Sequence, residues 1–183
     1  MDTVRYFKEI SKRQFKERRS TENVKIGLQN VQHDVATAAG FRSWASLLQA
    51  GEQDRQLAAV MHREPRLTRE GFGAGYFART LQQRRADFVR SREELRDSAD
   101  RVEQVRGWLV EHMEPRKTIN SASGGYGLKD LAERDLGSYV ANGELIAAAI
   151  IAGYTYQIHP ESPNASFGMS ARSIKVIWKR VHG

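Results

Sequence analysis

The first part of the chain repeats apolar residues at the spacing of an amphipathic helix. A first helix is predicted over residues 3–19, with Thr3 in the N-cap position. Its apolar side carries Val4, Phe7, Ile10 and Phe15. Cations fill a neighbouring stripe of the same helix. The pattern predicts a helix that packs through its phenylalanines and exposes its charges.

Three shorter helices are expected to follow. Val24, Leu28, Val31, Val35 and Ala38 keep a regular four-and-three spacing, and Gly40 stands where a helix often ends in a left-handed residue. Ser43 is placed to cap a short helix containing Trp44 and Leu47, and a further helix over 52–62 stops before Pro65. We expect residues 1–62 to form a helical module, with the Gly40–Trp44 corner as an anchor and Trp44 buried.

Residues 63–75 contain Pro65 and alternating glycines, and are predicted to be a linker. Beyond it, one apolar residue recurs every seven positions: Leu81, Phe88, Leu95, Val102 and Leu109. This repeat predicts a long central helix within 76–114, with Trp108 and Leu109 buried and Arg84 and Arg85 exposed. The second heptad position is mostly polar, so the first half of the helix should project or meet a partner. A homodimer through this helix is left open.

The C-terminal segment, 116–183, alternates helical and strand patterns. After a polar loop, helices are predicted over 126–136 and 143–152, strands over 154–158 and 165–169, and a last helix from Ser170. That helix places Ile174, Ile177, Trp178 and Val181 on one side. The expected fold is mainly α, ending in a small winged-helix-like α+β domain. The helix over 143–152 has one charge, Glu144, and no base-reading donor, which is typical of a core helix.

Composition excludes several kinds of chemistry. The chain has 183 residues and no cysteine, so disulfides, thiol catalysis and cysteine metal sites are excluded. The five histidines are scattered without paired metal-ligand spacing, and no nucleotide-binding glycine motif is present. No apolar run is long enough to span a bilayer, and no signal peptide is recognisable. We expect a cytoplasmic protein that is not an enzyme and has no metal or cofactor.

The net charge of +7 is the main pointer to a partner. A stripe on the first helix holds Arg5, Lys8, Lys12, Lys16 and Arg19. Such a stripe can bind the phosphates of a nucleic acid. It can also be a solvated face without a ligand, or it can contact a membrane surface or a partner helix. Further candidate contacts are Arg84, Arg85, Arg116, Lys117, Lys175, Lys179 and Arg180.

Two segments resemble known families. The run of residues 31–48, with its Gly-Phe-x-x-Trp corner and Leu-Leu pair, resembles a short glyoxalase-related helical module that would cover residues 24–50. That resemblance implies a packing unit without catalytic residues. Residues 126–150 and 163–170 are similar to small accessory proteins of plasmids and prophages, which implies a mobile genetic element.

Two functional hypotheses follow. The first is an accessory protein of a mobile element that binds nucleic acid or a nucleoprotein through basic helical surfaces. The second is an anti-defence inhibitor of the anti-CRISPR type, which docks on a host protein or ribonucleoprotein. A basic inhibitor would have to contact acidic protein surface or bound RNA.

Overall fold

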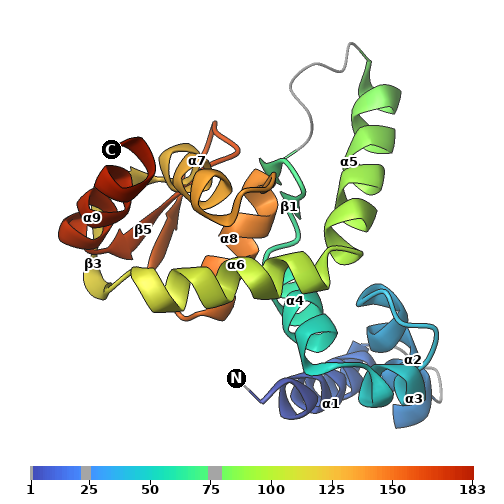
Figure 1. The fold of residues 1–183 in the computed structure, drawn as a ribbon. Coiled ribbons are helices and arrows are strands. Elements are labelled where there is room, and N and C mark those ends of the chain that lie inside the picture. The colour runs from blue at the N-terminus through green and yellow to red at the C-terminus, as the bar shows by residue number, and fades with distance from the viewer. Residues whose placement is uncertain (1, 22–25, 74–79) are drawn as a thin grey trace. The chain divides into compact units, whose positions relative to one another are not determined.

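The computed structural model describes residues 2–21, 26–73 and 80–183, and the expected mainly α fold is confirmed. The chain divides into two compact units, Met1–Pro65 and Arg66–Gly183. This boundary falls within the segment predicted to be a linker. Each unit has its own helices, and Figure 1 colours them from blue at the N-terminus to red at the C-terminus.

The N-terminal unit consists of α1 (Thr3–Thr21), α2 (Leu28–Ala38), α3 (Trp44–Gln49) and α4 (Glu52–Arg63). Its core contains Phe7, Ile10, Val31, Val35, Ala36, Ala39, Leu47, Ala58 and Ala59. The apolar spacing thus identified Phe7, Ile10, Val31 and Val35 correctly, but Ala38 is exposed and Ala39 is buried instead. Val24 lies outside the described residues. The capping residue of α1 is Asp2 rather than Thr3, because the Asp2 carboxylate accepts from the Arg5 amide at 2.9 Å.

The turn between α2 and α3 is built as the sequence indicates. Gly40 has a φ of 84°, and Ser43 caps α3 by accepting from the Ser46 amide at 3.1 Å. Phe41 and Trp44 pack against the core only in part. Trp44 is therefore half-buried, and the expectation of a buried side chain was wrong.

The predicted central helix is two helices, α5 (Leu81–Arg96) and α6 (Ala99–His112), which run in different directions (Figure 1). The heptad interpretation was wrong, and the first residues of the predicted helix, 76–79, lie outside the described residues. The break falls at Asp97–Ser98, where the Ser98 hydroxyl donates to the Leu95 carbonyl at 2.8 Å. Short polar side chains of this kind compete with the helical backbone bonds. Only Leu95 of α5 is buried, so packing does not hold the two helices in line.

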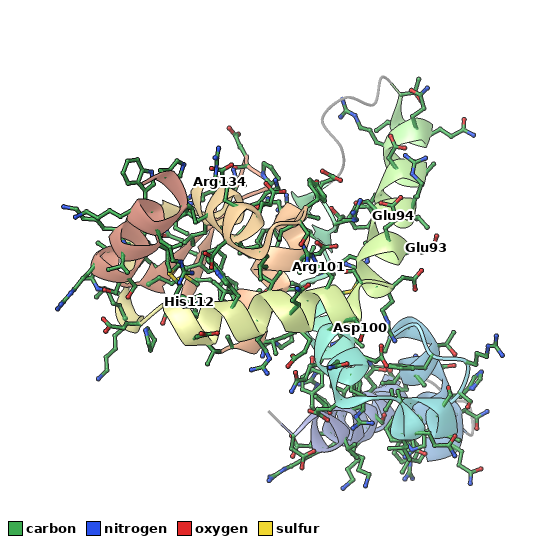
Figure 2. The ribbon with its side chains drawn as sticks, viewed as in Figure 1. Glu93, Glu94, Asp100, Arg101, His112 and Arg134 are labelled. Atoms are coloured by element: carbon green, nitrogen blue, oxygen red, sulfur yellow. The ribbon has the colours of Figure 1, made fainter. Side chains whose placement is uncertain are left out.

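Trp108 and Leu109 of α6 are buried, as expected. Arg101 of the same helix, labelled in Figure 2, donates to the Ser138 carbonyl at 2.8 Å and ties α6 to the turn after α7. Tyr154 adds a second tie, because its hydroxyl lies 2.9 Å from the Leu109 carbonyl oxygen. These bonds connect α6 to the C-terminal part of its unit.

The rest of the C-terminal unit combines strands with helices. It contains β1 (Leu67–Thr68), β2 (Gly71–Phe72), β3 (Pro115–Gly124), α7 (Gly125–Leu136), α8 (Asn142–Ile151), β4 (Tyr156–Ile158), β5 (Ala165–Met169) and α9 (Ala171–His182). The antiparallel sheet has the order β3-β5-β4. Two predictions need correction here. Residues 115–124 form a strand rather than a loop, and the supposed linker contains the β1–β2 hairpin.

Candidate nucleic-acid interface

Helix α8, the second helix of the α7–α8 pair, is buried. Every residue from Asn142 to Ile150 is enclosed, by contacts with α6, α7 and the β1–β2 hairpin. The Gly143 amide donates to the Arg69 carbonyl at 2.8 Å, and a Cβ added to Gly143 would lie 1.9 Å from the Thr68 carbonyl oxygen. The hairpin backbone therefore lies directly on the start of α8. The inference that this helix belongs to the core is confirmed.

The basic stripe of α1 lies on an exposed helix face. All its members are exposed, namely Arg5, Lys8, Lys12, Lys16 and Arg19. Arg5 pairs with Glu9 at 2.8 Å, and the Arg19 guanidinium lies 5.6 Å from the centre of the Phe15 ring. Within the described residues, the three lysines have no ion-pair partner. They are the part of the stripe that is available to a ligand.

The opposite side of α1 is fixed to α4. Phe7 is fully buried, and the Tyr6 hydroxyl lies 2.9 Å from Nδ1 of His62. Burial raises the pKa of Tyr6, while burial and then the charge of Arg13 lower the pKa of His62 from its usual value of 6.5. His62 is therefore neutral at pH 7, so no additional charge arises beneath the stripe.

Most other surface cations with a described partner are paired with acids close in sequence. Such pairs join Arg55 to Glu52, Arg90 to Asp87, Arg106 to Glu103, Lys129 to Glu133 and Arg134 to Asp130. Each pair cancels its own charge locally. The α1 lysines differ from these paired cations, as do Lys175 and Lys179 of α9, which also have no ion-pair partner among the described residues.

The arginines of α5 are a weaker candidate. Arg84 and Arg85 are exposed, as predicted. Acids share their helix, including Glu93 and Glu94, which Figure 2 labels. Arg92 has a structural role, because it donates to the Leu67 carbonyl at 2.9 Å and burial lowers its pKa. The helix therefore has no continuous cationic face.

The C-terminal candidates lie on two elements. Arg116 and Lys117 are exposed on β3, where Arg116 donates to the Thr118 hydroxyl at 3.3 Å. Lys175 and Lys179 are exposed on α9 and have no ion-pair partner among the described residues. These two lysines form a second set of available cations.

Arg180, in contrast, is engaged within the protein. Its guanidinium pairs with Asp135 of α7, which also accepts from the Trp108 indole at 2.6 Å. Desolvation opposes ionisation of Asp135, but the hydrogen bonds from Trp108 and Arg180 outweigh it and lower the pKa of this carboxyl. Arg180 thus joins α9 to α7, which weakens its case as a ligand contact.

Trp178 was missed as a surface residue. The sequence places it on the apolar side of the last helix, but the structure leaves 55% of it exposed. Its ring stacks on His182 with centroids 4.8 Å apart and an interplanar angle of 19°. The buried residues of α9 are Ser173 and Ile177, so the covered arc lies further round the helix than expected. No sequence signal separates Trp178 from its buried neighbours.

Other kinds of site find no support in the part of the chain that the structure describes. No cluster of three or more histidine or acidic side chains there could hold a metal ion. Membrane-spanning length and apolarity are likewise not combined in any described helix. Comparisons with protein-family models, curated proteins and solved structures find no match to this chain, so a function has to be argued from these surfaces.

Proposed function

We propose that this protein binds nucleic acid through phosphate contacts from exposed lysines, as an accessory protein of a mobile genetic element. The observation that carries the proposal is the set Lys8, Lys12 and Lys16 on α1. These side chains are exposed and have no ion-pair partner among the described residues, whereas cations such as Arg90 and Arg134 are paired with acids. An unpaired lysine can neutralise a phosphate without first breaking an internal ion pair.

The spacing of these lysines suits a linear polyanion. Successive members are four residues apart, so they lie about 6 Å apart along the helix axis. They keep nearly the same side of α1, and the docked Phe7 side holds the helix in place. A row of point charges of this kind fits a phosphate backbone and carries no base preference.

Burial of α8 also favours backbone contact over base reading. Helix α8 would be the base-reading helix of a winged-helix domain. It has no exposed donor side chain, because residues 142–150 are enclosed. Specific readout needs such donors at base edges in the major groove. We therefore expect binding that depends strongly on salt and weakly on sequence.

The experiment is a titration of labelled duplex DNA and duplex RNA with the full chain at several salt concentrations. Lys8→Gln, Lys12→Gln and Lys16→Gln are combined in one variant. Its salt slope should be lower than that of the parent by about three, since each lost phosphate contact removes about 0.9 from the slope for duplex DNA.

The matched control combines Arg90→Gln, Arg106→Gln and Arg134→Gln. It removes the same net charge, but from cations that are already paired with acids. It should bind nearly as the parent does. Equal binding by the lysine variant and the parent would reject the α1 surface. Absence of salt-dependent binding by the parent would reject the proposal and favour an inhibitor that docks on a host protein.

A further inference from the structure

Trp178 is a large apolar side chain that the fold leaves in solvent. It lies near the end of α9, and 55% of it is exposed. His182 stacks on it at 4.8 Å, and Nδ1 of His182 lies 3.0 Å from the Trp178 carbonyl oxygen. Stacking covers one face of the indole and restrains the ring. The exposed area therefore belongs mainly to the other face and the edge.

Two exposed cations lie close to Trp178 in the sequence of α9. Lys175 and Lys179 lie three residues before and one residue after Trp178, both exposed, and α9 carries no acidic residue. The helix dipole favours cations in the last turn but not at Arg172 or Lys175, which lie in the first part of the helix. Helix stability therefore does not explain the whole cationic face.

Acidic groups restrict the ligand to one side of α9. Glu111 and Glu114 border a shallow hollow together with Arg172 and Val176. An anion there would meet carboxylates, and Arg180 is held by Asp135. Trp178, Lys175 and Lys179 do not border this hollow. They mark the part of α9 on which an anionic ligand with an aromatic group fits.

We propose that this side of α9 binds single-stranded nucleic acid, with an unpaired base stacked on Trp178 and the adjoining phosphates on Lys175 and Lys179. The inference rests on the proposed function and adds to it a second site, for single strands. A duplex keeps its base faces covered by neighbouring pairs, whereas a single strand offers them to an aromatic side chain. Exposed aromatic rings beside cations are the usual components of single-strand sites.

A lipid surface fits this face less well. Interfacial helices insert a broad apolar face into the membrane. In α9 that face is turned inward, where Ile177 is buried, and the outer face offers only Val176 and Trp178 among its charges. Anionic vesicles are nevertheless included in the test.

The test measures the affinity of the full chain for an oligothymidylate of about 12 nucleotides, a length within the range of single-strand sites. Trp178→Ala should weaken this binding by about 5- to 100-fold, as expected for the loss of one stacked base, and leave the salt slope unchanged. Trp178→Phe should recover much of the loss. The oligothymidylate should quench tryptophan emission of the parent, and Trp178→Phe should remove the larger part of that quenching.

A second variant tests the phosphate contacts separately. Lys175→Gln with Lys179→Gln should lower the salt slope by about 1.4, because each contact to a single strand contributes about 0.7. The control is Val176→Ala, another exposed apolar residue of the same helix, which should bind like the parent. Circular dichroism of every variant checks that the fold is kept.

The outcomes separate this inference from the proposed function. If duplex binding depends on the α1 lysines but Trp178→Ala binds the oligothymidylate as the parent does, only the single-strand site is rejected. If the parent binds neither form of nucleic acid, both proposals fail. Trp178-dependent binding to anionic vesicles without binding to the oligothymidylate also overturns the inference.

Discussion

The hydroxyl of Tyr6 on α1 lies 2.9 Å from Nδ1 of His62 on α4, and the two rings meet edge to face with centroids 5.9 Å apart. Neutral imidazole with its proton on Nε2 can accept a hydrogen bond from the hydroxyl at this nitrogen, whereas imidazolium can only donate there. Burial and then the charge of Arg13 lower the pKa of His62. The contact that holds the back of the lysine-bearing helix is therefore sensitive to pH.

The free energy of unfolding should fall as pH decreases below about 6.5. Between that value and the lower folded pKa, the unfolded chain binds a proton at His62 that the folded chain does not. The contribution of His62 is present above the unfolded pKa and is lost as pH falls through the folded pKa, at no more than about 1.4 kcal/mol per pH unit. Urea unfolding of the parent and His62→Gln measures it. The variant should show a smaller decline, whereas His33→Gln, at an exposed position of α2, should keep the decline of the parent.

Substitution of Gly143 should disturb the contact between α8 and the β1–β2 hairpin. A Cβ there would lie 1.9 Å from the Thr68 carbonyl oxygen, so the backbone itself has to move. Gly143→Ala should lower the free energy of unfolding by about 1–3 kcal/mol, the range for overpacking. The control is Gly107→Ala in α6, where nothing lies within 4 Å of the added atom. That change should stabilise the protein by about 0.5–1 kcal/mol through helix propensity, and equal effects at both positions would contradict the close contact.

Leu95 should contribute most of the apolar anchoring of α5. It is fully buried, whereas Leu81 of the same helix is 73% exposed. Leu95→Ala should lower the free energy of unfolding by about 2–5 kcal/mol. Leu81→Ala should change it by less than about 0.5 kcal/mol. If the two variants lose the same stability in denaturant unfolding, α5 is not held as the structure indicates.

Asp135 should be important for joining α6, α7 and α9. Removal of its carboxylate leaves the buried Trp108 indole N–H without its 2.6 Å acceptor and frees Arg180. Asp135→Ala should therefore cost about 1–3 kcal/mol of stability. Asp130→Ala removes an acid of the same helix whose pair with Arg134 is about half exposed, and should cost less than about 1 kcal/mol. Thermal or urea unfolding distinguishes the two, and a neutral Asp135→Ala would contradict the structural role.

Local signals in the sequence were sufficient for the N-terminal helices and for α8. Gly40 marks the end of α2, and Ser43 marks the start of α3. Both signals are local, because a left-handed residue and an amide cap act only on residues close to them in the sequence. A segment without charges other than Glu144 has no side that favours water, so its place in the core could be predicted before any partner was known.

Tertiary structure decided the strand β3 and the exposure of Trp178, and it provided no packing to oppose the local break at Asp97–Ser98. An apolar repeat shows that residues share a helix face, but it does not show whether other elements of the fold cover the whole of that face. Helix α5 lacks such cover along most of its length, and β3 becomes a strand through its irregular pairing with β5. On α9, contacts with α7 and β3 accompany burial of Ser173 and Ile177 and leave Trp178 outside. Burial depends on neighbours that are distant in sequence, which is why the sequence determined the helix but not its exposed aromatic face.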